Sequence, residues 1–336
     1  MPTAQTVFFT APKQVEIREM LLPALQTDEV LVETVCSAIS AGTEMLVYRG
    51  QFPQLQDAHD AVSSELKYPL AYGYACVGVV RQIGKLVNSE WKDKFVFSFQ
   101  PHTSHFVTKP ENLFPIPHSL NPENACFLPN METAVNLVQD GAPILGERVM
   151  VLGQGIVGLL TASLLNEFPL EDLTVVDSIK LRRKAFHVEG PKSKVKSLAP
   201  DDLRSFDKLR TQPSTFDLVY ELTGSPSVLN TAIEHTAFSG RIVIGSWYGQ
   251  KRAEIDMGGS FHRSRIKLIS SQVSSISPKL SGRWDKSRRF EVAWQALERI
   301  QPQKWITHRF SLNDAAKAYQ LLDENPQETI QIIFEY

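Results

Sequence analysis

The sequence feature that most constrains the fold is a glycine-rich hexapeptide, Gly153-Gln154-Gly155-Ile156-Val157-Gly158. The segment before it, Arg148–Leu152, is short and apolar and predicts a buried strand, whereas Ile156–Phe168 has the length of a helix. A second strand with a charged exit is predicted at Leu173–Asp177. Strand, glycine turn, helix and strand in this order predict a βαβ unit of a parallel sheet.

Each glycine of this turn has a separate physical role. Gly153 permits the tight turn, Gly155 lets the backbone approach a pyrophosphate, and Gly158 allows the helix to pack on its strand. The N–H groups at the helix start then face phosphates. Asp177 follows at about the spacing where an acid hydrogen-bonds an adenosine ribose diol, so the combination predicts a nicotinamide dinucleotide site. The alternative is a plain βα turn in which Asp177 caps the next helix.

The choice between NAD and NADP depends on the side chains around Asp177. Its carboxylate is expected to repel a 2′-phosphate, whereas Lys180, Arg182 and Arg183 offer positive charge that would attract one. We predict NAD as the cofactor, with NADP as the alternative and Arg182 among the cofactor-binding residues.

The composition excludes several classes of function. The 336 residues have the length of about two domains, and a formal net charge of -2 with a pI near 6.5 gives no global basic field. We therefore expect no nucleic-acid partner and no membrane partner. Cys36, Cys76 and Cys126 suit a reducing compartment, and no export signal is visible, so we predict a cytoplasmic protein. The most apolar stretch, Val149–Leu165, is broken by glycines, which argues against a membrane span.

The predicted secondary structure changes near residue 118. Before it, short β-like runs are separated by Pro, Gly, Asn and Asp; they are predicted as strands at Val15–Ile17, Glu29–Ala38, Val77–Ile83 and Phe95–Phe99. After it, strand and helix signals alternate: helices at Ala125–Leu137 and Val228–His235, strands at Phe216–Glu221 and Arg241–Gly245, an amphipathic helical stretch at Phe290–Leu322, and a closing strand at Thr329–Phe334. The predicted class is α/β.

The order of these segments resembles the medium-chain dehydrogenase/reductase superfamily. The resemblance is carried by Tyr68–Gly73, by Val77-Gly78-Val79-Val80, and by the glycine turn. It covers the whole chain. It implies a GroES-like β-rich catalytic domain at 1–118, a Rossmann domain with a doubly wound parallel sheet at 119–270, and a C-terminal segment, 271–336, that returns to the first domain. The active site would lie in the cleft between the domains.

The same resemblance implies further cofactor contacts and an assembly. The segments Phe216–Gly224 and Ser239–Gly245 look like the family's later cofactor-contacting strands. They add Thr223, Gly224, Gly245 and Ser246 to the cofactor-binding residues. The family also implies a homodimer built by extending the Rossmann sheet.

All three positions of the family's catalytic zinc ligands depart from the pattern. Ala41, or Ser40 in a shifted register, stands where the first cysteine belongs, and Tyr74 replaces the histidine. The third position falls near Pro129 or Asn130. Zinc needs Cys, His or carboxylate donors, and four clustered structural cysteines are also missing. We therefore expect no zinc.

Without zinc, a side chain must move the proton that accompanies hydride transfer. Tyr74 is the first candidate, with a satisfied, merely cleft-lining hydroxyl as the alternative. Candidates for orienting the substrate are Thr43, Glu44, Asn130 and Glu132. For Glu44 the alternative, an ion pair that holds its loop without touching substrate, is favoured. His102 and His105 are interpreted as packing residues rather than metal ligands.

These residues predict an NAD(P)-dependent, zinc-independent oxidoreductase acting on a small secondary alcohol or ketone. Ile39–Glu44, Gln100–His105 and Asn130–Thr133 look most like the bacteriochlorophyllide a dehydrogenase and threonine-dehydrogenase-like branch. The alternatives are an enone or quinone reductase and a catalytically silent dinucleotide sensor or assembly protein. Two basic clusters remain open: His262–Arg265 as an anion site or a solvated loop, and Arg283–Arg289 as a surface or subunit edge.

Overall fold

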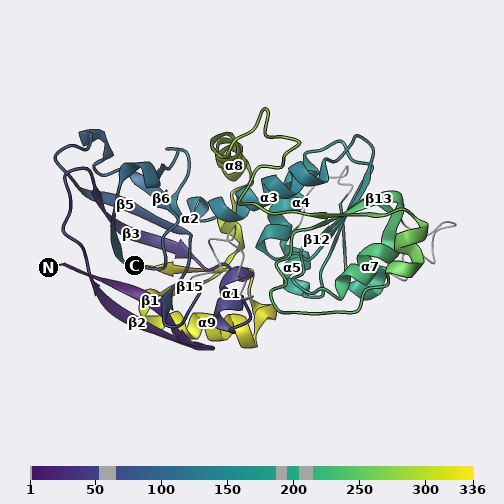
Figure 1. The fold of residues 1–336 in the computed structure, drawn as a ribbon, viewed down its shortest axis with the longest axis horizontal. Coiled ribbons are helices and arrows are strands. Elements are labelled where there is room, and N and C mark those ends of the chain that lie inside the picture. Colours follow the sequence, from purple (N-terminus) through teal and green to yellow (C-terminus); the bar gives the residue numbers. More distant parts are fainter. Residues whose placement is uncertain (1, 53–65, 187–194, 204–214) are drawn as a thin grey trace. The chain divides into compact units, whose positions relative to one another are not determined.

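The computed structural model describes residues 2–52, 66–186, 195–203 and 215–336, and the chain forms two compact units (Figure 1). Unit 1 comprises Met1–Pro129 and Leu297–Tyr336, and unit 2 comprises Asn130–Ala296. The division points of these compact units lie inside two helices, α3 (Leu128–Gly141) and α8 (Lys286–Ile300). Among the described residues, no helix is both long and apolar enough to cross a membrane.

Unit 1 is built mainly from two sheets: a smaller antiparallel sheet and a larger mixed sheet in which only β15 and β16 run parallel among the described pairs. The smaller has the order β2-β1-β4, from β1 (Thr3–Ala11), β2 (Gln14–Leu21) and β4 (Leu70–Ala71). The larger has the order β15-β16-β3-β5-β6-β8, with β7 also paired to β3. Its strands are β3 (Val30–Ala38), β5 (Cys76–Ile83), β6 (Phe95–Ser98), β7 (His105–Thr108), β8 (Phe114–Pro115), β15 (Ile306–Ser311) and β16 (Gln331–Glu335).

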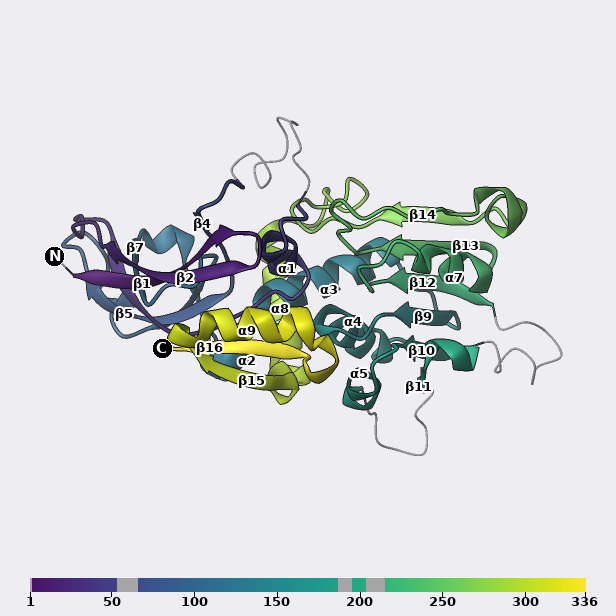
Figure 2. The same cartoon turned by 90° about the horizontal axis from the view of Figure 1, so that it is seen from below.

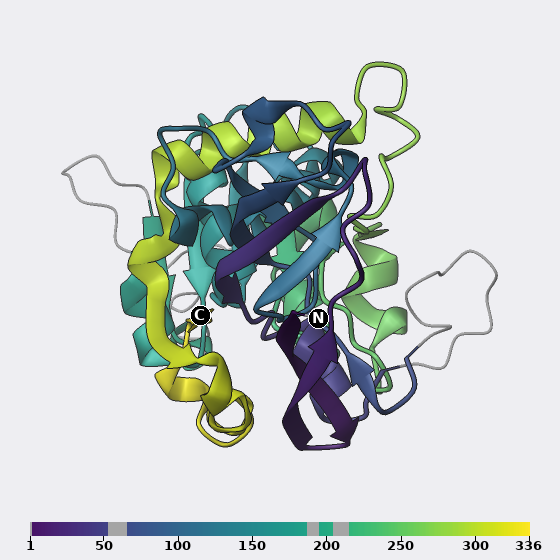
Figure 3. The ribbon, with the colours of Figure 1, turned by 90° about the vertical axis from the view of Figure 1, so that its left-hand side faces the viewer.

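The end of the chain completes unit 1. Strand β16 pairs with β3 on one side and β15 on the other, and Figure 3 shows both chain ends in this unit. Three helices pack on its sheets: α1 (Thr43–Tyr48), α2 (Pro122–Ala125) and α9 (Ala315–Glu324). The core contains Phe9, Tyr319 and Phe334, all fully buried, so residues from both ends of the sequence share one apolar cluster.

Unit 2 is a six-stranded parallel sheet. Its order, β11-β10-β9-β12-β13-β14, is visible as a fan of strands in Figure 2. The strands are β9 (Arg148–Leu152), β10 (Asp172–Val176), β11 (Val195–Leu198), β12 (Phe216–Glu221), β13 (Thr236–Ile244) and β14 (Lys267–Ser270). The helices are α4 (Ile156–Asn166), α5 (Lys180–Ala185) and α7 (Val228–His235), with most of α3 and α8. This is the doubly wound arrangement that the sequence predicted.

Two helix predictions need correction. Phe290–Leu322 is not one helical stretch: α8 ends at Ile300, β15 intervenes, and only then does α9 begin. Pro302 lacks the N–H that a continuing helix needs, and pairing with β16 selects strand for the segment after it. The helix predicted at 125–137 is likewise two helices, because α2 ends at Ala125 and α3 begins at Leu128.

The three cysteines are free and buried, and all belong to unit 1. The Sγ atoms of Cys36 and Cys126 lie 3.3 Å apart, which is contact between two thiols. Burial raises the pKa of the Cys76 and Cys126 thiols, so both stay protonated and unreactive at neutral pH.

Candidate active site

The glycine turn of unit 2 forms an open cradle at the start of α4. A Cβ atom on Gly155 would meet nothing within 4 Å, whereas one on Gly158 would lie 1.9 Å from the carbonyl oxygen of Gly153. Gly153 itself has a φ of 93°, which favours glycine. No side chain caps α4, so the N–H groups of its first turn remain available to a phosphate. The arrangement fits a dinucleotide pyrophosphate.

The predicted ribose acid lies beside this turn. Asp177 accepts hydrogen bonds from the backbone N–H of Gln154 at 2.7 Å and of Ile179 at 2.7 Å, and it is mostly buried. Arg183 Nη1 donates to the carbonyl oxygens of Asp177 and Ser178, which holds this side chain against the end of the strand. Burial lowers the pKa of Arg182, and the charge of Asp177 opposes that shift.

A second group of polar residues lies at the ends of β12 and β13. Glu221 is fully buried and accepts from the N–H of Thr223 at 2.8 Å and from the hydroxyl of Tyr248 at 2.6 Å. The N–H of Gly224 donates to Ser246 Oγ at 2.9 Å. Parallel strands end at one edge of the sheet, so this group shares the carboxyl edge with the glycine turn.

The basic cluster at His262–Arg265 lies at the wrong edge to be an anion site for this cofactor. It precedes β14, which runs parallel to β13, so it sits at the amino edge of the sheet, opposite the glycine turn. His262, Arg263 and Arg265 are exposed there. Of the two interpretations left open by the sequence, the solvated loop agrees with this topology.

Glu132 is held in a buried ion pair within unit 2. Its Oε1 accepts from Arg289 Nε at 3.0 Å and also from Lys286. Arg289 is fully buried and also donates to Asn136 and to the carbonyl oxygens of Val273 and Ser275, so it is not the surface residue that the Arg283–Arg289 cluster suggested. Asn130 is buried in the first turn of α3.

Tyr74 belongs to a hydroxyl cluster in unit 1. Its phenol donates to Ser40 Oγ at 2.5 Å, and the Thr43 hydroxyl is a second hydrogen-bond partner. Burial raises the pKa of Tyr74, the nearby Glu44 raises it further, and the two hydroxyl contacts partly oppose this. The phenol is therefore a proton donor at neutral pH.

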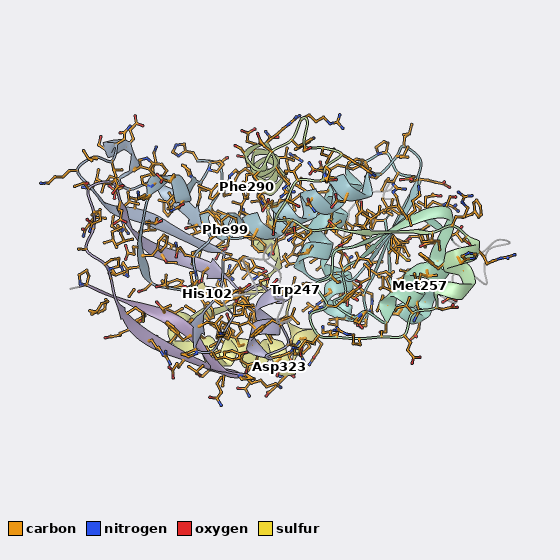
Figure 4. All side chains as sticks on the ribbon, viewed as in Figure 1. Phe99, His102, Trp247, Met257, Phe290 and Asp323 are labelled. Atoms are coloured by element: carbon orange, nitrogen blue, oxygen red, sulfur yellow. The ribbon has the colours of Figure 1, made fainter. Side chains whose placement is uncertain are left out.

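Glu44 holds this cluster in place through buried hydrogen bonds. It is fully buried and accepts from Ser40 N at 2.8 Å, from His102 Nε2 at 3.0 Å and from the Tyr319 hydroxyl at 2.6 Å. His102 Nδ1 lies 2.7 Å from Ser37 Oγ, so its two ring nitrogens are both occupied. Figure 4 labels His102 inside this unit. The ion-pair interpretation of Glu44 agrees with this geometry, and Glu44 has no free oxygen directed at a substrate.

The donor set at the three zinc positions does not suit a catalytic zinc. Ser40 Oγ is occupied by the Tyr74 phenol, and the remaining positions offer Ala41, Pro129 and Asn130. Among the described residues, no cluster of three His, Cys, Asp or Glu side chains could hold a metal ion.

Comparison with known proteins relates the whole chain to dehydrogenases. No family model matches it. The starvation-sensing protein RspB of Escherichia coli K12 is 20% identical over 366 residues, covering 99% of both chains. Sorbitol dehydrogenase 1 of Saccharomyces cerevisiae is 24% identical and covers 80% of this chain and 82% of its own. The 2-desacetyl-2-hydroxyethyl bacteriochlorophyllide A dehydrogenase of Cereibacter sphaeroides is 22% identical, covering 98% and 97%.

The chain is a homologue of medium-chain dehydrogenases. The fold agrees: the structure of RspB from Escherichia coli CFT073, solved with NADH, matches with a TM-score of 0.77 and 19% identity over 99% of both chains. The superfamily resemblance and the GroES-like and Rossmann architecture are thereby confirmed.

Sequence reasoning did not single out two residues of this medium-chain dehydrogenase homologue, Glu221 and Tyr248, whose hydrogen bond joins the end of β12 to the loop after β13. An acid at the end of a largely apolar strand was the available signal for Glu221. His102 was interpreted as a packing residue, but its contact with Glu44 was not predicted. Both contacts join residues far apart in the sequence, and no spacing indicates them.

Proposed function

We propose that this protein is an NAD(P)-dependent oxidoreductase that interconverts a small secondary alcohol and its ketone. The observation that carries the proposal is the uncapped start of α4 behind Gly155, where a Cβ would meet open space. Named dehydrogenases among its homologues supply the reaction class. When bound, the nicotinamide supplies hydride chemistry, and the protein must hold the cofactor and handle a proton.

We propose that unit 2 holds the cofactor through its carboxyl edge. The backbone of Gly153–Gly158 takes the pyrophosphate, and Asp177 takes the adenosine ribose. Thr223, Gly224, Gly245 and Ser246 take the nicotinamide half. NAD is preferred over NADP because the Asp177 carboxylate repels a 2′-phosphate.

We propose that Tyr74 gives its phenolic proton to the ketone oxygen without help from zinc. Its raised pKa keeps it protonated, and Ser40 and Thr43 fix the hydroxyl. Glu44 and His102 hold this cluster in place, and Glu132 supports α3 through Arg289. The poor donor chemistry at the zinc positions supports this assignment.

Tyr74→Phe tests the proton donor. Ketone reduction should fall by about 10²–10⁴, the usual contribution of general acid catalysis, while the NADH dissociation constant stays unchanged. Tyr72→Phe is the matched control, because this neighbouring ring lies 6.2 Å from Tyr74 and has no assigned role in the reaction. Turnover equal in both variants removes Tyr74 from the mechanism.

Titration with NADH and NADPH, with metal analysis of the same sample, tests the wider proposal. NADH binding without stoichiometric zinc supports it, and bound zinc contradicts the metal-free assignment. NADH binding without hydride exchange on any alcohol or ketone would indicate a silent dinucleotide-binding protein.

We also propose a cytoplasmic homodimer that pairs through β14. This strand is the edge of the parallel sheet, and Leu268 on it and Phe238 on β13 are exposed by 37% and 70%. The free thiols support a reducing compartment. A monomer in sedimentation at micromolar concentration contradicts the dimer.

A further inference from the structure

The two halves of the parallel sheet in unit 2 differ in what they offer a ligand. The half formed by β9, β10 and β11 carries the glycine turn and Asp177, which suit a pyrophosphate and an adenosine ribose. The half formed by β12, β13 and β14 is left for the nicotinamide nucleotide, and therefore for the substrate that reacts with it. Side chains at the carboxyl ends of these strands select the substrate.

A short loop follows β13 at this edge and is fastened at both ends to the turn after β12. Ser246 Oγ accepts from Gly224 N at 2.9 Å, and Lys251 Nζ donates to the Gly224 carbonyl at 2.7 Å. Between them, the Tyr248 hydroxyl donates to the buried Glu221 at 2.6 Å, and the Tyr248 ring packs on the apolar core of the unit. The loop is therefore rigidly placed.

Trp247 stands between two residues that both face inward. Since Ser246 and Tyr248 are held by the end of β12, the indole between them is directed away from the core and is 37% exposed. Figure 4 labels Trp247 at the end of unit 2 opposite Met257. By contrast, Trp91, Trp284 and Trp305 each lie under a lysine or arginine side chain. Among the described residues, no ring or cation contacts the Trp247 indole.

We propose that Trp247 is a specificity-determining residue whose indole provides a flat surface for an aryl or conjugated substrate. The inference rests on the proposed function and names its substrate class: a secondary alcohol or ketone whose carbinol carbon bears a planar ring. An indole held on a rigid loop offers a large apolar face at little cost in side-chain entropy, and ring pairs add to affinity beyond the area they bury.

A matched pair of ketones tests the proposal. Acetophenone and cyclohexyl methyl ketone have the same carbon skeleton size, but only the first has a planar ring, and the saturated ring is no less hydrophobic. The aryl ring also conjugates with the carbonyl group, but this electronic difference is the same in every variant, so a change of the ratio between variants reports ring geometry. We expect Trp247→Leu to lower the ratio of kcat/KM for acetophenone over cyclohexyl methyl ketone by about two- to tenfold relative to the unaltered protein, the range of ring–ring contacts.

The control variant is Trp284→Leu, which removes an indole that is occupied by Arg288 at 4.4 Å. It should leave the ratio of the two ketones unchanged. Saturation-transfer NMR on the NAD-loaded protein measures binding of both ketones, so the comparison does not depend on turnover.

The outcomes separate this inference from the function on which it rests. Failure to bind NADH removes the proposed function. NADH binding with a ketone ratio that Trp247→Leu leaves unchanged overturns the role of Trp247 alone. Loss of NADH affinity in Trp247→Leu with an unchanged ketone ratio also overturns it, because the indole would then contact the cofactor.

Discussion

Replacement of His102 by alanine should destabilise unit 1 strongly. The imidazole donates to Glu44 across 3.0 Å, both side chains are fully buried, and the ring packs edge-on against Phe334 at 5.0 Å between centroids. A hydrogen bond to a charged group contributes about 1.5–3 kcal/mol and the ring contact about 0.5–1.5 kcal/mol. The sum is a loss of about 3 kcal/mol in the free energy of unfolding, similar to the cost of breaking a buried ion pair.

Urea denaturation followed by far-UV circular dichroism measures this loss. With an m-value of about 2 kcal/mol/M, the midpoint should fall by about 1.5 M. His105→Ala is the control: His105 is only partly buried and its Nδ1 lies 3.1 Å from a neighbouring serine hydroxyl, so the loss should stay below about 0.5 kcal/mol. If the two variants unfold at the same urea concentration, the buried network does not stabilise the unit as argued.

Three further predictions follow from the site. Gly155→Ala should fold normally but lose NADH affinity at least tenfold, since its Cβ fills the phosphate approach; Gly158→Ala should also lose stability, because its Cβ would lie 1.9 Å from the Gly153 carbonyl oxygen. Thermal unfolding and NADH titration separate the two, and equal stability would contradict the argument. Arg289→Met should cost about 3–5 kcal/mol in urea denaturation: Glu132 keeps Lys286 but loses its buried guanidinium, and Asn136 Oδ1 and the carbonyl oxygens of Val273 and Ser275 lose their donor; a loss below about 1 kcal/mol would count against it. Burial raises the pKa of Tyr74 above 10.0, so its contribution to stability is fully present below pH 10.0 and is lost as pH rises from 10.0 through the higher folded value. The pH profile of kcat/KM for ketone reduction should therefore stay level up to pH 10.0 on its alkaline side, and an earlier decline would exclude Tyr74 as the proton donor.

Local patterns predicted unit 2 well because its elements are set by short-range signals. The bounds of β9, β12 and α7 match the predicted segments, and the central strands β9, β10 and β12 are mostly buried on both faces, as central parallel strands are. The glycine turn is equally local. The prediction of a helix across Phe290–Leu322 was wrong because β15 becomes a strand only through pairing with β16. The amphipathic pattern of the segment itself does not reveal this pairing.

The site in unit 1 was only partly predictable for the same reason. Tyr74 was found from its position in the family pattern, but Glu44 and His102 are 58 residues apart and meet only in the folded unit. Trp247 likewise owes its orientation to Glu221, at the end of another strand. Contacts between distant segments are decided by tertiary packing, so the spacing of residues in the sequence does not predict them.

The position of β16 in the larger sheet determines the order in which the two units fold during synthesis. Strand β3 cannot acquire this neighbour until Gln331–Glu335 has left the ribosome, whereas unit 2 is one continuous segment whose contacts are all available earlier. Long-range strand pairing is slow, so unit 2 should fold first and unit 1 should wait with an open sheet edge. Strand β7 can already pair with the Val30–Glu33 part of this edge, so the nascent chain leaves the Cys36–Ala38 part unpaired for most of translation, and aggregation during expression should begin there.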